Sequence, residues 1–245
     1  MAVLFHPLEA VPVGNPALPS LLQEGIFVPD ISWSNPQCGA SGDYLIQKRL
    51  RPCQQSDSLG LHHASLWGQS EMAIATWSIR ERFNLQIELG SGQFFWQWQQ
   101  GAQNLSGQST GGLIGNADAK LVIFDVRDTM LAVDAHAGGW MGMGGSASIN
   151  GTAVAHRTRA ALRYWQLGVA MTQKISIFSP YLGVAVNRTH FQVSSLFPAL
   201  GAFHARHIVG PFGGCSICAG SRFLINLEWR GWFEEGIALS AQLRL

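Results

Sequence analysis

The nine residues 237–245 read IALSAQLRL, and two sets of side chains alternate along them. Neighbouring side chains of an extended strand point to opposite faces, so this alternation predicts a β-strand with one apolar face. Residues 223–230, FLINLEWR, repeat the pattern immediately upstream. The end of the chain is therefore predicted to form two successive strands, each with one apolar face and one polar or small-residue face.

Alternation of the same kind recurs in five more runs, at 84–89, 94–99, 131–136, 165–172 and 181–187. Weaker strands are predicted near 43–51, 60–69, 71–80, 119–126 and 201–210. Turn-forming residues separate some of the runs, as at Asn150-Gly151 and Gly90-Ser91-Gly92. The pattern predicts about twelve strands, and ten to fourteen are compatible with it, because single-chain bacterial barrels have even strand counts.

The composition excludes several classes of protein. Charged residues make up only 13% of the 245 residues, about half the share of an ordinary soluble domain, and apolar residues make up 47%. No segment has the roughly 18 consecutive apolar residues that a membrane-spanning helix needs. The net charge of +1 argues against a nucleic-acid-binding surface. Two classes remain: a soluble all-β protein with an unusually apolar surface, and a β-barrel whose outer face contacts lipid.

The polar faces of the predicted strands favour the barrel. Several carry Gln, Asn, Glu or Arg in mid-strand, and a dry core would leave each such group without a partner at a cost of about 1–3 kcal/mol. The apolar faces include large aromatics such as Phe94, Trp96 and Trp98, as expected of a wall that faces lipid. Phe95 and Tyr181 are exceptions, because they fall on the polar face. The predicted fold is all-β: a transmembrane antiparallel up-and-down β-barrel of the bacterial outer membrane.

The polar faces are predicted to line a water-filled lumen. Small residues at Gly168, Ala170, Gly183 and Ala185 leave space on this face. Channel selectivity depends on pore width and on charges that project inward, and both signs are present, so at most weak ion selectivity is expected. The predicted pore-lining residues are Glu88, Asp134, Lys174, Glu228, Arg230 and Arg244.

Several short segments resemble the chlamydial major outer membrane porin family. Residues 12–21, PVGNPALPSL, are similar to the start of the mature family members, and 23–26 continue the likeness. Residues 178–184, FSPYLGV, with Arg188-Thr189-His190-Phe191, resemble a Pro-Tyr-Ile-Gly-Val strand of the family. The last five residues, AQLRL, resemble its Ala-Gln-Phe-Arg-Phe end. Gly42-Asp43-Tyr44 and Arg49-Leu50 are similar to its first strand.

The resemblance implies a passive porin, organised as a homotrimer, in the cell envelope. Residues 1–10 are too short and lack the basic start of a complete export signal, which by itself favours an ordinary amino terminus. Because family members are cleaved just before the Pro-Val-Gly-Asn-Pro run, the resemblance instead implies a signal remnant ending at Ala10. A Pro/Gly-rich segment at 11–40 and the barrel at 41–245 follow. The chain departs from the family in being shorter, in having four cysteines, and in ending on Leu245 rather than Phe.

The four cysteines are Cys38, Cys53, Cys215 and Cys218, an even count that allows three pairings. For an exported protein, disulfides within the chain or to neighbouring envelope proteins are favoured. Free thiols and a metal site are the alternatives. Cys215 and Cys218 form a Cys-x-x-Cys motif in what is predicted to be a Gly-rich loop. A zinc site would need a second closely spaced pair, and Cys38 and Cys53 are too far apart in the sequence to supply it.

No enzymatic activity, cofactor or metal is predicted. Residues 107–111, GQSTG, match a nucleophile-elbow motif around Ser109, but no buried strand and helix flank it, so a polar loop is the better interpretation. His62-His63 and the pair His204 and His207 lack a helical metal-binding frame.

The predicted function is passive diffusion of small hydrophilic solutes and ions through a water-filled barrel. The alternative is a structural or adhesive barrel that is plugged and linked to the envelope by disulfides. A narrow barrel fills with side chains, so the strand count bears directly on this choice. Membrane lipid is the expected partner in both cases.

Overall fold

The computed structural model describes residues 37–52, 61–79, 82–109, 111–194, 202–205, 208–219, 223–232 and 235–244. In these ranges the regular secondary structure is β-strand. They contain no helix that is long and apolar enough to cross a bilayer. The predicted signal remnant at 1–10 lies outside the described residues, as does most of the segment at 11–40.

Twelve strands form one antiparallel sheet. The first six are β1 (Gln37–Pro52), β2 (Leu61–Ile79), β3 (Phe83–Gln100), β4 (Gln103–Gln108), β5 (Gly112–Val126) and β6 (Thr129–Ile149). The other six are β7 (Thr152–Gln173), β8 (Phe178–Ser194), β9 (Ala202–Ala205), β10 (Val209–Ala219), β11 (Phe223–Arg230) and β12 (Glu235–Arg244). The predicted antiparallel all-β fold is confirmed.

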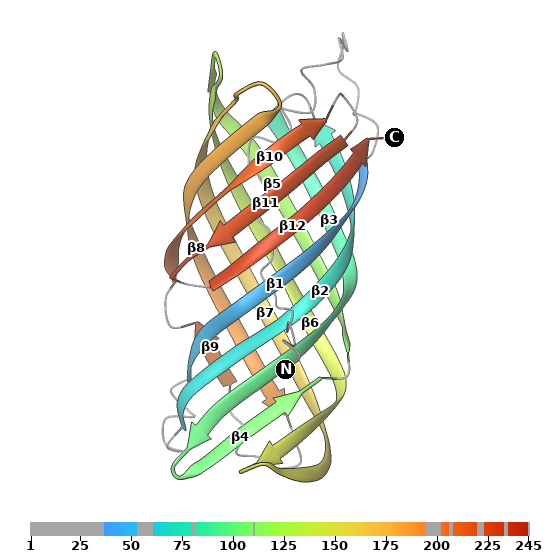
Figure 1. Cartoon of the computed structure of the whole chain (residues 1–245), viewed down its shortest axis with the longest axis vertical. Helices are drawn as coiled ribbons and strands as arrows, with labels where there is room; N and C mark the ends of the chain where they lie inside the picture. The colour runs from blue at the N-terminus through green and yellow to red at the C-terminus, as the bar shows by residue number, and fades with distance from the viewer. Residues whose placement is uncertain are drawn as a thin grey trace, which may run out of the picture.

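The sheet closes on itself at two levels with different numbers of strands (Figure 1). In the upper part of Figure 1 the ring runs β1-β2-β3-β5-β6-β7-β8-β10-β11-β12 and returns to β1, which makes ten strands. In the lower part β4 takes the place of β5, and β9 alone joins β8 to β1, which makes eight. We refer to these as the ten-strand part and the eight-strand part. The barrel is therefore narrower at its lower end.

The strand boundaries differ from the predicted ones at two places, each of which continues a strand where a break was predicted. The predicted turn at Gly90-Ser91-Gly92 is wrong, because β3 continues through it and joins the runs 84–89 and 94–99. A Cβ atom on Gly90 would lie 2.0 Å from the carbonyl oxygen of Glu71 on β2. Gly90 therefore allows a close approach of two strands, which is the other common role of glycine in a strand. The runs at 60–69 and 71–80 are likewise parts of the single strand β2.

The predicted turn at Asn150-Gly151 is present. It joins β6 and β7, the two longest strands, with 21 and 22 residues. Asn150 has a φ of 50° and Gly151 a φ of 81°, as a two-residue hairpin turn with left-handed residues requires. Asn and Gly are the residues that adopt this conformation at the lowest cost, so the local sequence determines the register of the hairpin.

Replacement of Gly151 by Val should destabilise this hairpin by about 1–2 kcal/mol, because a β-branched side chain is strained at positive φ. Ala153→Val is the matched control, since Ala153 is an exposed position in β7 where a β-branched residue is favourable. Guanidinium unfolding of both variants in lipid vesicles would measure the difference. Equal midpoints for the two variants would contradict this account of the turn.

Candidate functional site: the barrel interior

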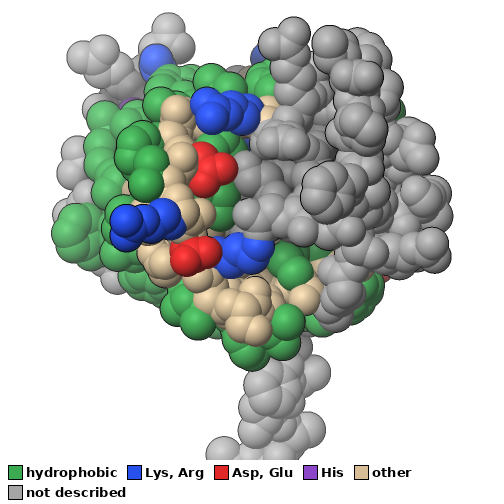
Figure 2. Space-filling model, turned by 90° about the horizontal axis from the view of Figure 1, so that it is seen from above, with side chains coloured by type: hydrophobic (Ala, Val, Ile, Leu, Met, Phe, Trp, Pro, Cys, Tyr) green, Lys and Arg blue, Asp and Glu red, His purple; other side chains and the backbone are tan. Residues whose placement is uncertain are grey.

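The outer face of the ten-strand part is an apolar belt. Every second residue of its strands points outward, and many of these side chains are large, apolar and exposed, as in Leu167, Val169 and Met171 on β7. Seen from above, hydrophobic side chains lie along the left and lower edges of the part drawn in colour, and Lys, Arg, Asp and Glu side chains lie among them at this end of the barrel (Figure 2). Other members of the belt are Leu85, Ile87, Leu89, Leu121, Ile123, Leu182, Val184, Leu227, Trp229, Ile237 and Leu239.

The interior of the ten-strand part is polar. Glu88 on β3 accepts hydrogen bonds from the side-chain amides of Gln86, at 2.5 Å, and Asn116, at 2.8 Å. The hydroxyl of Tyr164 donates to the Asn116 carbonyl oxygen, and the His136 ring stacks on the Tyr164 ring with centroids 5.5 Å apart. Hydrogen bonds therefore connect β3, β5 and β7 across the inside of the ring.

A second group of polar side chains lies on the opposite wall. Arg230 donates from Nε to Glu228 Oε1 at 2.7 Å, and both side chains are almost fully buried. Tyr181 donates its hydroxyl proton to Glu228 Oε2 at 2.8 Å and accepts from Asn226 at 3.1 Å. Because a buried carboxylate is costly unless it is paired and hydrogen-bonded, this set of contacts is what allows Glu228 to lie inside.

Two aspartates complete the charged layer. Lys120 Nζ lies 3.2 Å from Asp118 Oδ2 on the same strand, β5. Asp134 on β6 is fully buried, and neither of its carboxylate oxygens has a hydrogen-bond partner among the described residues. Lys120 and Arg230 lie within electrostatic range of Asp134. The layer thus holds four acidic and two basic side chains, with Asp134 the least satisfied of them.

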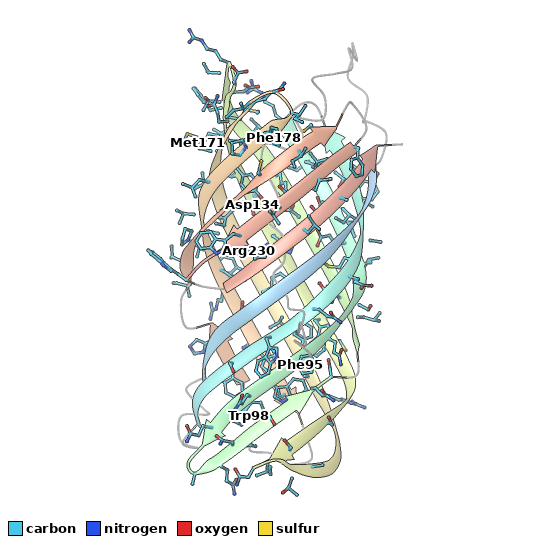
Figure 3. All side chains as sticks on the ribbon, viewed as in Figure 1. Phe95, Trp98, Asp134, Met171, Phe178 and Arg230 are labelled. Atoms are coloured by element: carbon cyan, nitrogen blue, oxygen red, sulfur yellow. The ribbon has the colours of Figure 1, made fainter. Side chains whose placement is uncertain are left out.

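An aromatic plug fills the interior of the eight-strand part and the adjoining end of the ten-strand part, where Trp140 is paired with Ile114 of β5. We define the plug as Phe94, Trp96, Trp98, Trp140, Phe191 and Phe203. These rings belong to one buried hydrophobic cluster, to which strands from β2 to β9 contribute. Trp96 and Phe191 have ring centroids 6.0 Å apart, and Trp98 and Phe203 have centroids 5.3 Å apart. In Figure 3, Trp98 lies low in the barrel, whereas Asp134 and Arg230 lie above it.

The structure places four of the six predicted pore-lining residues in the interior: Glu88, Asp134, Glu228 and Arg230 are all buried. Lys174 instead follows the end of β7, where it is half-buried and its backbone N–H donates to the carbonyl of Asp128. The backbone of Arg244 ends β12, but its side chain lies outside the described residues. The interior location of the four follows from strand alternation, which predicts a face correctly wherever the strand is regular.

The small residues on the inner face do point inward, but neighbouring side chains fill the space above them. A Cβ atom on Gly168 would lie 2.3 Å from Asp134 Oδ1, and one on Gly183 would lie 2.6 Å from Cζ of Phe212. These glycines therefore make room for large side chains from adjacent strands rather than leaving the lumen empty.

The predicted outward orientation of Phe94, Trp96 and Trp98 is wrong, since all three are buried inside the barrel. Phe95, predicted to face inward, points outward and stacks on Trp67 of β2. The cause is the turn predicted at 90–92: without it, the even-numbered residues of β3 continue on the same face as Glu88. The plug was missed for this reason, and an uninterrupted count of alternation from Glu88 would have revealed it.

The other interior residues that sequence analysis missed are Asn116, Asp118 and Lys120. They are spaced by two along β5; Asn116 and Asp118 lie upstream of the strand predicted near 119–126, and Lys120 lies at its start. The same spacing in a polar-rich segment is the signal that could have revealed them.

The Cys-x-x-Cys motif lies in strand β10, not in a loop. Cys215 and Cys218 are free thiols, both half-buried. Residues three apart in a strand point to opposite faces and are about 10 Å apart, beyond the reach of a disulfide, so these two cysteines do not pair with each other. Cys53 and the side chain of Cys38 lie outside the described residues, so a disulfide between these two, or from any of the four cysteines to another envelope protein, stays a prediction.

Ser109 has a structural role in the linkage between β4 and β5. Its Oγ accepts a hydrogen bond from the backbone N–H of Phe94 at 2.9 Å, and its own N–H donates to the Phe94 carbonyl at 2.8 Å. No helix follows it, so the nucleophile-elbow geometry is not formed. Within the described ranges no three His, Cys, Asp or Glu side chains are arranged to hold a metal ion.

No family model matches the chain, and no curated protein matches its sequence. Among solved structures, it is similar to the outer membrane protease OmpT from Escherichia coli, at 8% identity and a TM-score of 0.47, over 87% of this chain and 96% of that one. It is also similar to the translocator domain of the autotransporter NalP from Neisseria meningitidis, at 10% identity and a TM-score of 0.46, over 91% and 92%. The transport unit of the autotransporter AIDA-I from Escherichia coli is similar at 10% identity and a TM-score of 0.46, over 96% of this chain and 98% of that one.

The class of the protein follows from its own geometry. In lipid every backbone polar group must be paired, and a closed antiparallel ring satisfies this requirement without a helix. An apolar outer belt around a polar interior is the arrangement of outer-membrane barrels. The chain is an outer-membrane β-barrel.

Replacement of Arg230 by Met should destabilise the barrel by about 3–5 kcal/mol, because it leaves the Glu228 carboxylate buried without its cation. The double variant Glu228→Gln/Arg230→Met should recover most of this loss, since the neutral amide can still accept from Tyr181. Guanidinium unfolding in vesicles measures both, with the outward-facing Trp229→Leu as control. A double variant no more stable than the single one would contradict the proposed pairing.

Proposed function

We propose that this protein is a structural outer-membrane barrel whose lumen is closed by its own side chains, and that it does not provide an open pathway for solutes. The observation that supports this most directly is the contact between Trp96 on β3 and Phe191 on β8. On the eight-strand ring these strands lie four positions apart in either direction, which places them on opposite walls. A ring contact between them crosses the lumen.

The width of the ring supports the same proposal. An eight-strand barrel has an interior just wide enough for side chains to fill. Here the filling side chains are large and apolar, and Trp96, Phe191 and Phe203 are almost fully buried. Apart from indole N–H groups such as that of Trp98, the rings of the plug offer water and ions no polar groups to bind. A hydrophobic constriction of this kind opposes conduction even where a narrow gap exists.

Passive conduction, the function of a porin, is the second candidate. It is favoured by the charged layer of the ten-strand part, where buried side chains of both signs point inward. To cross this part, solutes would have to displace its buried charged side chains, and beyond it they would meet the rings of the aromatic plug. The plug is the stronger barrier of the two, because its rings are apolar.

The sequence resemblance to the chlamydial major outer membrane porin family leads us to propose that the chain is a short, divergent member of that family. We propose that its role is not enzymatic, because Ser109 is occupied in bonding the backbone of Phe94. The family resemblance implies a homotrimer. The protein mass of the detergent-solubilised particle tests this, because a trimer should have three times the 26.6 kDa of one chain.

Planar-bilayer conductance of the refolded protein tests the closed lumen. The native chain should give no discrete, stable conductance steps. The double variant Trp96→Ala/Phe191→Ala should give them, because it removes the two rings that meet across the lumen. Each truncation of a buried aromatic residue lowers the stability of the barrel by about 3–5 kcal/mol. The single variant Phe191→Ala is therefore included in case the double variant does not fold. Far-UV circular dichroism confirms that each variant is folded and β-rich.

Phe95→Ala is the matched control, because Phe95 is the neighbour of Trp96 on the same strand but faces outward. It should stay silent in the bilayer. Discrete steps from the native protein would overturn the closed-lumen proposal and establish the porin. Steps from Phe95→Ala equal to those of the double variant would show that general loosening, rather than loss of the plug, opens the barrel.

A further inference from the structure

The outer face of β7 and β8 changes abruptly from apolar to basic. Trp165 and Leu167 on β7, with Val186 on β8, belong to the exposed apolar belt. The next outward-facing positions toward the eight-strand part are Arg163 on β7 and Arg188 on β8, both exposed. The belt therefore ends within one alternation step on both strands.

Strand register brings the basic side chains together. Arg163 is paired with His190, which in turn is paired with His204 on β9. Arg188 is paired with Trp165 and lies two residues from His190 along β8. Directly opposite residues on one face of a sheet have Cβ atoms about 5 Å apart, so these side chains form one surface patch. We call Arg163, Arg188 and His190 the belt-edge basic patch.

No acidic side chain balances this patch from the neighbouring outward positions. Those positions hold Gly139 and Met141 on β6, Ala161 on β7 and Gln192 on β8. Within the described ranges neither Arg163 nor Arg188 has an ion-pair partner. The opposite end of the barrel is different, because its turns and strand ends carry charges of both signs, at Asp125, Arg127, Asp128 and Lys174.

The position of the patch corresponds to the lipid headgroups. At a rise of about 3.3 Å per residue and a tilt of about 40°, the stretch from Trp165 to Gln173 spans roughly 20–25 Å along the barrel axis, which matches the height of the apolar band of outer-membrane barrels. Arg163 lies just beyond one edge of that band, and Trp165 occupies the interfacial position typical of tryptophan.

We propose that the belt-edge basic patch binds the phosphate groups of anionic membrane lipids. Arginine suits this ligand because its planar guanidinium donates two parallel hydrogen bonds to phosphate oxygens. Two arginines on adjacent strands, with a histidine between them, present such donors at the depth where lipid phosphates lie. The apolar belt below the patch holds the acyl chains of the same lipids.

The connections between strands indicate which leaflet is involved. At the end away from the patch they are short, at 80–82, 127–128, 174–177 and 220–222. At the other end 101–102 and 150–151 are two-residue turns, whereas 53–60 and 195–201 are the longest connections between strands. Outer-membrane barrels have short periplasmic turns and longer external loops. The eight-strand part therefore projects outward, and the patch faces the lipid phosphates of the outer leaflet.

Lipid retention by the detergent-solubilised full chain tests the site. Phosphatidylglycerol and phosphatidylcholine with identical acyl chains are added in turn, and bound lipid is counted by native mass spectrometry. The native protein should retain the anionic lipid preferentially. Each replacement, Arg163→Gln or Arg188→Gln, should weaken that retention about fivefold, and the double variant roughly thirtyfold, as expected for arginines at a membrane surface.

Arg127→Gln is the matched control, because Arg127 is an exposed arginine on the β5–β6 turn at the other end of the barrel. It should leave lipid retention unchanged. Equal retention of the two lipids by the native protein, or an unchanged double variant, would overturn the proposal. Displacement of phosphatidylglycerol by millimolar inorganic phosphate would assign the patch to free phosphate instead. Conductance plays no part in this test, so its outcome is independent of whether the lumen is closed.

Discussion

The structure depends on one constraint: in a closed antiparallel ring every side chain must point either inward or outward, in strict alternation. Backbone hydrogen bonds that close the ring leave no free sheet edge, as a membrane requires. Once Glu88 faces inward, each even-numbered residue of the uninterrupted strand β3 faces inward as far as Trp98. The same strand thus contributes Glu88 to the charged layer and, below it, Phe94, Trp96 and Trp98 to the aromatic plug.

The change from ten strands to eight coincides with an exchange of polarity between the two faces. In the ten-strand part the outside is apolar and the inside is polar. In the eight-strand part the inside is aromatic, whereas exposed outward positions such as Arg159, Arg188 and Gln192 are polar. The surrounding solvent explains the exchange, because apolar side chains are stabilised next to lipid in one part and away from water in the other. The eight-strand part is therefore built like a soluble barrel with a packed core.

Much of this arrangement was predictable from the sequence. Alternation in the runs at 165–172 and 223–230 predicted the faces of those strands correctly, and Asn150-Gly151 predicted the hairpin between the longest strands. The plug was not predictable by the same rule once Gly90 was taken for a turn, because a break in the strand removes the link to Glu88. Whether a glycine marks a turn or a close approach depends on the neighbouring strand, and the sequence around Gly90 contains no information about Glu71 of β2.

Pairwise contacts between distant strands were also beyond local sequence rules. The partners of Glu228 come from β8 and β11, and the contact of Trp96 with Phe191 joins opposite walls. Such contacts depend on how far the ring is sheared as it closes, which is a property of the whole sheet. Alternation along a strand determines whether a side chain faces inward or outward. Closure of the sheet determines which side chains of distant strands it contacts.

The buried charges indicate how far water enters the barrel. An isolated carboxylate in a dry interior costs several kcal/mol, yet both oxygens of Asp134 lack a hydrogen-bond partner among the described residues. Water molecules that hydrogen-bond to such groups are a regular part of protein interiors. The cations Lys120 and Arg230 offset part of the cost of burying Asp134, and enclosed water molecules would complete its hydrogen bonds. The rings of the plug offer water almost no partners, so water held beside the charged layer would differ from water that passes through the barrel.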